Sequence, residues 1–161
     1  MAAGPVLVIA CGLGDDAEEL ASRGWTVTAF DVSSTAIDWC HRRFPDSSVD
    51  YHAADLFALP PAWRQVFDLV VEIRTLQSIE PARRTVAMQA VAACVRPGGY
   101  AFVHCLLGEE AAPLPESPPH PLTLAELRAF EEAGLVLVTC AEGETADGRG
   151  RSVTLAYRRS Q

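Results

Sequence analysis

The segment Val6–Ala17, taken with Val27–Asp31, constrains the fold of this chain more than any other stretch. The first segment joins a short apolar run to Gly12 and Gly14, and the second is an apolar run that ends in Asp31. This order of strand, glycine turn, helix start and second strand is typical of the first half of a nucleotide-binding βαβ unit. Glycines leave space for a ligand beside the backbone because they carry no Cβ. The carboxylate at the end of the second strand can bind ribose hydroxyls, so we expect an adenosine-containing cofactor.

Two acidic residues after the glycines bear on which cofactor this is. The glycine turn, continued to Ala17, also fits the dinucleotide fingerprint, and Asp31 lies near the expected offset of about 20 residues. Asp15 and Asp16 fall in the first helical turn, where they would repel a pyrophosphate bound to free N–H groups. S-adenosylmethionine has no phosphate and carries a sulfonium and an ammonium, so it tolerates carboxylates there. The alternative is that both aspartates only cap the helix and complement its dipole.

Strand-like and helix-like segments alternate along the 161 residues, which predicts one domain with a parallel sheet and helices on both faces. The expected strands are Val6–Ala10, Trp25–Phe30, Val49–His52, Phe67–Ile73, Tyr100–Leu107 and an antiparallel pair at Leu135–Cys140 and Ser152–Tyr157. The expected helices are Asp15–Arg23 and segments from Ser33 to about Arg43, from Glu80 to about Val95 and from Thr123 to about Ala133. A loop from Gly108 to Pro121 contains five prolines.

Charge and composition argue against several classes of function. The formal net charge is −8, and all 13 basic residues are arginines with no basic stripe, which disfavours a nucleic-acid partner. No apolar run approaches the roughly 18 residues of a membrane helix. The five cysteines are scattered without a Cys-x-x-Cys pair, which indicates a reducing cytoplasm rather than disulfides or a zinc site. No histidines or carboxylates have metal-ligand spacing, so we expect no metal.

Five motifs resemble those of class I S-adenosylmethionine-dependent methyltransferases, and they follow one another along the chain in the order that the family has. Within that superfamily the chain is most similar to small-molecule enzymes of the thiopurine and tellurite-resistance type. The motifs are Cys-Gly-Leu-Gly-Asp-Asp from Cys11, Val-Thr-Ala-Phe-Asp-Val-Ser from Val27, Ala54-Asp55-Leu56, Phe67–Glu72 and Arg96-Pro-Gly-Gly99, so the resemblance covers nearly the whole chain.

The resemblance implies a Rossmann-like, doubly wound α/β sheet of seven strands, mostly parallel with the last strand antiparallel. It implies a single class I methyltransferase domain over residues 1–161, with a short or truncated N-terminal lid. It also implies SN2 transfer of a methyl group from S-adenosyl-L-methionine to a small-molecule acceptor, with S-adenosyl-L-homocysteine as product.

Candidate cofactor residues directly follow the strands, because ligands of such sheets bind beyond the carboxyl ends of the strands. We expect the backbone of Cys11, Gly12 and Gly14 to hold the methionine half of the cofactor. Asp16 is a candidate for holding the ammonium group, since the chain lacks the acidic residue that the superfamily favours near the end of the first strand. Asp31 should bind both ribose hydroxyls.

The adenine end of the cofactor involves the second and third strands. Val32 would flank the adenine face. The resemblance implies that Asp55 accepts a hydrogen bond from the adenine amino group. Leu56 lies beside it, where a backbone N–H would donate to a ring nitrogen. Asp55 can equally begin the turn before Pro60.

The sequence says less about which residues bind the methyl acceptor. Glu72 ends an otherwise apolar strand, where a carboxylate is costly unless it is paired or faces a cleft. We expect Glu72 to contact the cofactor near its methyl group, which makes it the candidate catalytic residue. The alternative is a salt bridge to Arg74 or Arg96. Arg74 and His120 are candidates for lining the acceptor. Without a convincing dedicated base, a thiol or another soft nucleophile is favoured.

Three questions stay open at the sequence level. The lid is expected to come from the loop 108–121, from a second subunit in a homodimer, or to be missing through truncation. A protein that binds the cofactor without methyl transfer is one alternative function. An NAD-dependent oxidoreductase is another, disfavoured by Asp15 and Asp16 and by the absence of lysine for a Tyr-x-x-x-Lys pair.

Overall fold

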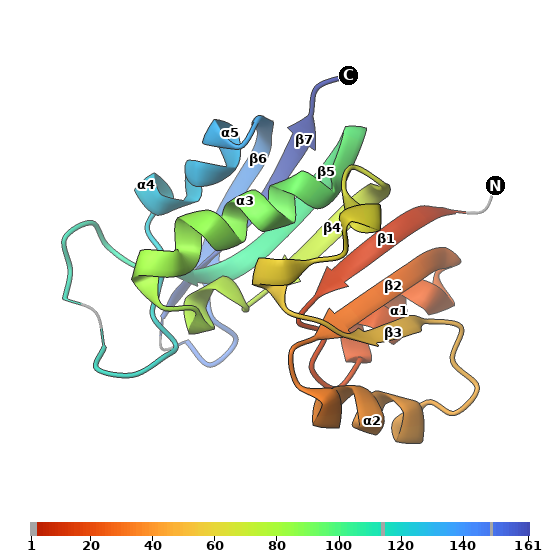
Figure 1. Ribbon diagram of the computed structural model, residues 1–161. Helices are drawn as coiled ribbons and strands as arrows, with labels where there is room; N and C mark the ends of the chain where they lie inside the picture. The colour runs from red at the N-terminus through yellow and green to blue at the C-terminus, as the bar shows by residue number, and fades with distance from the viewer. Residues whose placement is uncertain (1–2, 114, 149) are drawn as a thin grey trace.

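The computed structural model describes residues 3–113, 115–148 and 150–161. Within these ranges seven β-strands form one sheet in the order β3-β2-β1-β4-β5-β7-β6 (Figure 1). The strands are β1 (Ala3–Ile9), β2 (Trp25–Asp31), β3 (Asp50–Ala53), β4 (Phe67–Ile73), β5 (Val95–Leu107), β6 (Leu135–Glu144) and β7 (Arg151–Arg159). The pairs among β1 to β5 are parallel, and β7 runs antiparallel to both of its neighbours. The predicted Rossmann-like, mostly parallel sheet is confirmed.

Most strand bounds lie within two or three residues of those expected from the sequence, and β5 and β6 are the exceptions. The strand β6 continues to Glu144, four residues beyond the expected end at Cys140. The strand β5 begins at Val95 instead of Tyr100, because Val95 pairs with Phe67 and the ladder resumes only at Tyr100 opposite Leu69. The predicted turn at Pro97–Gly99 is therefore an irregularity inside the strand. At Gly99 a Cβ would lie 2.9 Å from the carbonyl oxygen of Phe67, so the strands meet too closely there for a side chain.

The first two helices have nearly the predicted bounds, whereas the helix predicted from Glu80 begins as a 3-10 turn and becomes α-helical only at Arg84. The helices are α1 (Asp15–Ser22), α2 (Ser34–Arg43), α3 (Arg84–Cys94), α4 (Leu124–Leu127) and α5 (Ala129–Glu132), with 3-10 turns η1 (Leu56–Ala58), η2 (Pro61–Trp63), η3 (Leu76–Ser78) and η4 (Pro81–Arg83). Ser33 caps α2, and Thr123 with Glu126 forms the expected capping box. The helix expected up to Ala133 is divided at Arg128, which separates α4 from α5. Among the described residues, none of the helices has the length and hydrophobicity that crossing a bilayer requires.

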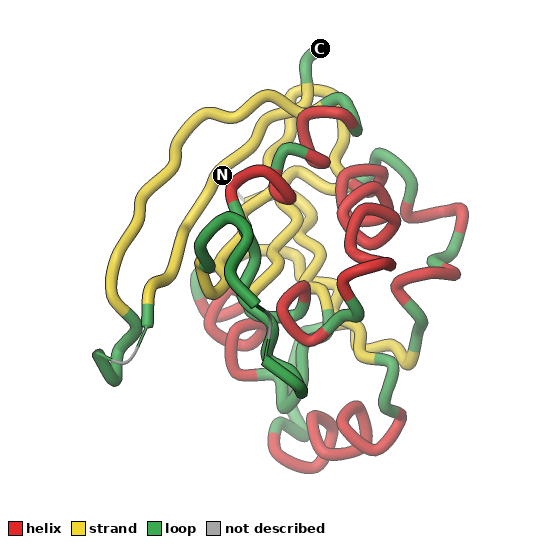
Figure 2. Tube along the Cα trace, turned by 90° about the vertical axis from the view of Figure 1, so that its left-hand side faces the viewer, coloured by secondary structure: helices red, strands yellow, loops and turns green. Residues whose placement is uncertain are grey.

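Two clusters of buried side chains hold the layers together. One joins α1 and α2 to β1, β2 and β3, and the other joins α3 and α5 to the opposite face around β4, β5 and β7. Figure 1 shows α3 in front of the sheet and α1 behind it. The β6–β7 hairpin projects beyond the helices (Figure 2), and every residue of β6 after Leu135 is exposed.

The strand order reverses between β1 and β4, which are neighbours in the sheet but distant in the chain. In doubly wound sheets this reversal opens a crevice at the carboxyl ends of the strands, since the two connections leave in opposite directions. The residues after β1, β2, β3 and β4 therefore surround one place in the fold.

Candidate functional site at the carboxyl ends of the strands

The glycine turn after β1 presents bare backbone to the crevice. Gly12 and Gly14 have φ values of 55° and 90°, in the region that favours glycine. A Cβ on Gly12 would meet nothing within 4 Å, whereas a Cβ on Gly14 would lie 2.6 Å from the hydroxyl oxygen of Tyr51. Gly14 is therefore needed for packing, and Gly12 leaves open space where a ligand can approach the backbone.

Asp31 connects the end of β2 to that turn. Its Oδ2 accepts a hydrogen bond from the N–H of Gly12 at 3.0 Å, and its Oδ1 accepts one from the N–H of Ser33 at 2.9 Å. Each carboxylate oxygen can accept a second hydrogen bond, so the contacts within the protein leave capacity for hydroxyl donors. Gly12 and Asp31, both predicted from the sequence, are thus brought into direct contact.

Asp15 serves a structural role that the sequence left open. Its carboxylate receives two hydrogen bonds from the guanidinium of Arg43, at 2.7 and 3.0 Å. These bonds and the charge of Arg43 lower the pKa of Asp15. Asp15 begins α1, and Arg43 ends α2, so the pair ties two helices together. Arg43 was not among the predicted site residues, because nothing in its local pattern points to a partner 28 positions away. Asp16 is exposed, and its contact with a ligand stays a prediction.

Cys11 follows β1 as predicted and lies beside Cys40. Burial, together with the neighbouring Cys40 and Asp31, raises the pKa of the Cys11 thiol to about 12. The Cys40 thiol donates to the carbonyl oxygen of Gly12 at 3.4 Å. Both groups are therefore neutral thiols that support the turn, rather than thiolate nucleophiles.

The candidates for the adenine end have different surroundings. Val32 is 74% exposed directly after β2, and its contact with an adenine ring stays a prediction. The Asp55 side chain is exposed and accepts a hydrogen bond from the N–H of Phe57 at 2.9 Å, which begins η1. The turn-starting role considered for Asp55 is therefore present. Leu56 is buried, so only its backbone is placed to meet a ligand.

Glu72 is fully buried at the end of β4. Its Oε1 accepts hydrogen bonds from the N–H groups of Thr75 and Leu76, at 2.6 and 3.0 Å, while its Oε2 has no partner among the described residues. Burial raises the pKa of this carboxyl to about 7 against the opposing effect of the two N–H donors. The alternative salt bridge is not formed, since Arg96 pairs with Asp68 and Arg74 forms no ion pair within the described part of the chain. Glu72 thus holds the turn between β4 and η3, and its predicted contact with the cofactor stays a prediction.

His120 and Arg84 anchor the proline-rich loop to α3. His120 is buried; its N–H donates to the carbonyl oxygen of Gln77 at 2.7 Å, and neither ring nitrogen has a partner among the described residues. Arg84 is only 1% exposed and donates to the carbonyl oxygen of His120 at 2.6 Å and to Glu126 at 2.9 Å. Sequence reasoning missed Arg84; its partner Glu126 was recognised, but only as a helix cap.

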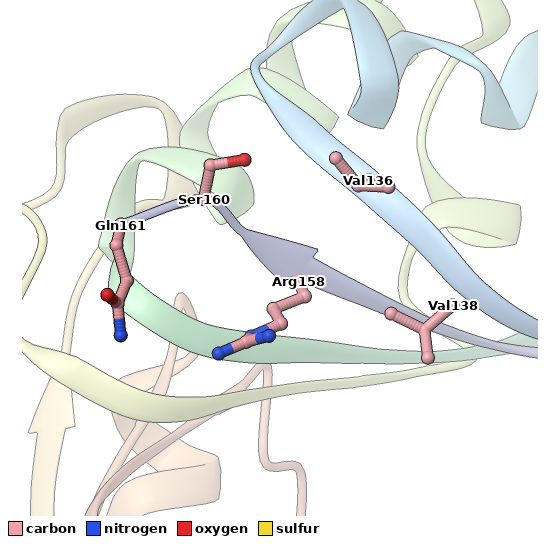
Figure 3. Close-up of a pocket in the computed structure, with 5 residues that line it drawn as sticks. All are labelled: Val136, Val138, Arg158, Ser160 and Gln161. Atoms are coloured by element: carbon pink, nitrogen blue, oxygen red, sulfur yellow. The ribbon is translucent and has the colours of Figure 1, made fainter.

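Cavities lie near both ends of the strands of the sheet. One of about 350 Å³ is at the carboxyl edge and is lined by Arg74, Gln77, Leu106, Pro119 and residues 145–147. Another, of about 580 Å³, is lined by Val136, Val138, Arg158, Ser160 and Gln161 (Figure 3). Arg158 pairs with Tyr100 near the start of β5, so the second cavity lies at the opposite edge from the glycine turn. Among the described residues, no group of three or more metal-binding side chains is placed to hold an ion.

A family model described as a methyltransferase domain matches residues 6–99, which is more than half of the chain. The chain therefore belongs to the methyltransferase domain family. The match begins with β1 and ends at the glycines inside β5, so it contains the whole crevice described above.

Two curated relatives indicate what kinds of methyltransferase this chain is similar to. A ubiquinone biosynthesis O-methyltransferase of Aromatoleum aromaticum is 35% identical over 99 residues, which cover 60% of this chain and 42% of that protein. A probable thiol methyltransferase 2 of Arabidopsis thaliana is 25% identical over 150 residues, which cover 90% of this chain and 64% of the relative. The chain therefore spans less than two thirds of either protein.

Solved structures share the fold at low identity. A SAM-dependent methyltransferase from Methanosarcina mazei superposes with a TM-score of 0.84 at 20% identity, covering 99% of this chain and 94% of that one. The 1,6-didemethyltoxoflavin-N1-methyltransferase of Burkholderia thailandensis, solved with bound 1,6-didemethyltoxoflavin and S-adenosylhomocysteine, superposes with a TM-score of 0.81 at 18% identity, covering 98% of this chain and 71% of that one.

Proposed function

We propose that this chain binds S-adenosyl-L-methionine and transfers its methyl group by SN2 displacement to a small-molecule acceptor. The observation that carries the proposal is the contact between Asp31 and the N–H of Gly12, in a chain of the methyltransferase domain family. This contact joins a ribose-binding carboxylate to a glycine turn with open space beside it, as an adenosine with a short zwitterionic tail requires.

The roles of the residues follow from where the strands end. Gly12 and the backbone around it would hold the methionine portion, and Asp31 the ribose. Val32 and Asp55 would contact the adenine on the side of β2 and β3. The cofactor supplies an activated methyl group, so the protein accelerates transfer mainly by aligning the acceptor with it. Because adenosine occupies the β2–β3 side, the acceptor approaches from the side of β4 and β5.

A thiol acceptor fits this arrangement better than an alcohol. The Oε1 of Glu72 holds the N–H groups of Thr75 and Leu76, and its Oε2 has no partner among the described residues. With a pKa of about 7, this carboxyl is a weak base for an alcohol. A thiol ionises near neutral pH and needs no strong base, whereas a hydroxyl usually does. The resemblance to a thiol methyltransferase over 90% of the chain is consistent with this choice.

We further propose that residues 1–161 act as one domain in the cytoplasm. All five cysteines are free thiols, which suits a reducing compartment. A second subunit and the loop 108–121 remain the candidates for a cover over the acceptor.

The function is tested by titrating S-adenosylhomocysteine into the protein and by assaying a panel of thiols, phenols and amines for methylated product by mass spectrometry. Binding together with a methylated thiol is the expected result. Binding without product from any acceptor would favour a protein that holds the cofactor without methyl transfer. Thermal stabilisation by NADH but not by S-adenosylhomocysteine would favour an oxidoreductase.

Replacement of Asp31 by alanine should weaken S-adenosylhomocysteine binding by about 1–3 kcal/mol, the range for hydrogen bonds to a charged group. Part of the loss comes from the glycine turn, since the N–H of Gly12 also loses its acceptor. Isothermal titration calorimetry gives the dissociation constant. Asp38, exposed on α2, provides a matched control whose alanine variant should bind as the wild type does. An unchanged dissociation constant for Asp31→Ala would show that the ribose lies elsewhere.

A further inference from the structure

The cavity at the carboxyl edge lies where an acceptor would have to enter. Arg74 directly follows β4, Leu106 lies near the end of β5, and Pro119 comes from the proline-rich loop. Its volume of about 350 Å³ falls in the range of small-molecule sites, roughly 300–1,000 Å³. It is on the β4–β5 side of the crevice, away from Asp31 and the adenine end.

The backbone fixes Arg74 at the mouth of this cavity. Arg74 has a φ of 64°, a left-handed conformation that costs an arginine energy and persists only where its surroundings enforce it. Two contacts enforce it here. The N–H of Arg74 donates to the carbonyl oxygen of His104 at 2.8 Å, and the buried Glu72 holds the next two N–H groups of the turn. The turn therefore positions the arginine rather than leaving it on a flexible loop.

The Arg74 side chain is exposed, and its charge is not offset by an ion pair within the described ranges. Within the same ranges, ion pairs are formed by Arg23, Arg43, Arg84, Arg96 and Arg151. Arg74 has no such partner among the described residues, although the chain has 21 acidic residues and a net charge of −8. Asp147 also lines the cavity, and its carboxylate accepts a hydrogen bond from the hydroxyl of Thr145 at 2.6 Å. Burial and the charge of the neighbouring Arg74 lower the pKa of His104.

From this geometry we infer that the methyl acceptor carries an anionic group, a carboxylate or an equivalent oxyanion, and that Arg74 binds it in the cavity beside Gln77 and Leu106. The inference rests on the proposed methyl transfer and adds the chemical class of its acceptor. A guanidinium binds a carboxylate through two parallel hydrogen bonds, and Leu106 and Pro119 supply apolar surface beside it. Glu72 is then a positioning residue, which acts through the turn that carries Arg74.

The test uses equilibrium binding, so that it does not depend on turnover. The protein is first saturated with S-adenosylhomocysteine, in a separate titration that reports on the proposed function itself. Two probes of the same shape are then titrated, 4-(methylthio)benzoate and its neutral analogue 4-(methylthio)benzamide, whose capped sulfur does not ionise. The wild type should bind the benzoate about tenfold more tightly than the benzamide. This factor is the size expected of a charge-assisted hydrogen bond that solvent partly screens. Higher salt should weaken benzoate binding and leave benzamide binding unchanged.

Arg74→Gln should abolish the preference for the anion, while Arg74→Lys should keep part of it. Arg128→Gln, a change at an exposed position between α4 and α5, should leave both dissociation constants unchanged. All three variants should still bind S-adenosylhomocysteine. Failure of the benzoate to bind, equal affinity for both probes, or a preference that survives in Arg74→Gln would each overturn the inference while leaving methyl transfer intact. Failure of S-adenosylhomocysteine to bind would instead overturn the proposed function and the inference together.

Discussion

Replacing Arg84 with methionine is expected to lower the free energy of unfolding by about 3–5 kcal/mol. The guanidinium is buried and donates to the carbonyl oxygens of Ile79, His120 and Pro121 as well as to Glu126. The side chain of Glu126 is 33% exposed, so water can hydrate its carboxylate in the variant. Most of the lost stability therefore comes from the carbonyl oxygens that are left without a donor. The same change should release the end of the proline-rich loop from α3.

Urea unfolding followed by circular dichroism measures this loss. The matched control is Arg23→Met, which breaks an arginine–glutamate pair with Glu19 that is exposed on both sides. A surface pair of this kind contributes at most about 0.5 kcal/mol, so the control should unfold close to the wild type. Equal effects of the two substitutions would mean that the contacts of Arg84 do not stabilise the fold.

Raising the pH from about 4.5 to above 7 should reduce the contribution of Glu72 to stability by about 3 kcal/mol. Burial raises the pKa of this carboxyl in the folded chain from an ordinary value of 4.5 to about 7. Between these two values the folded state binds the proton that the unfolded state has already released, so stability falls as the pH rises. Below 4.5 the contribution is fully present, and it is lost as the pH passes through 7.

Glu72→Gln isolates this effect, because an amide keeps an oxygen that can accept from Thr75 and Leu76 but does not ionise. The variant should have nearly the stability of the wild type at pH 5 and should exceed it by about 3 kcal/mol at pH 8. Glu131→Gln, at an exposed position in α5, should show no such divergence. If the difference in free energy of unfolding between the wild type and Glu72→Gln stays constant from pH 5 to pH 8, the carboxyl titrates as an exposed one does.

Local patterns predicted most of the elements and two residues that meet where β1 and β2 end, Gly12 and Asp31. The apolar run Phe67–Ile73 forms β4 with those bounds, Ser33 caps α2, and Thr123 with Glu126 forms a capping box. These succeed because a cap, a turn or a buried strand is specified by residues within a few positions of one another. The glycine turn and Asp31 were likewise predicted together, since the spacing of a βαβ unit places the ends of its two strands side by side.

The acceptor side could not be predicted in the same way. Glu72 was expected to meet the ligand or an arginine, yet its carboxylate holds the turn before η3. A strand position alternates between the two faces of a sheet, but which face lies under a helix and which opens to a cleft depends on the other layers. Arg84 and Glu126 are 42 positions apart, and no local signal links them.

By itself, the sequence of this chain determined a doubly wound sheet, most of its strand ends and a glycine turn beside the carboxylate of Asp31, because short-range sterics and hydrophobic patterning specify those features. Only the tertiary structure decided which charged groups are neutralised and which are not. It enclosed Glu72 and Arg84 and left Arg74 without an ion pair within the described residues, because pairing between side chains far apart in the chain depends on how the layers pack.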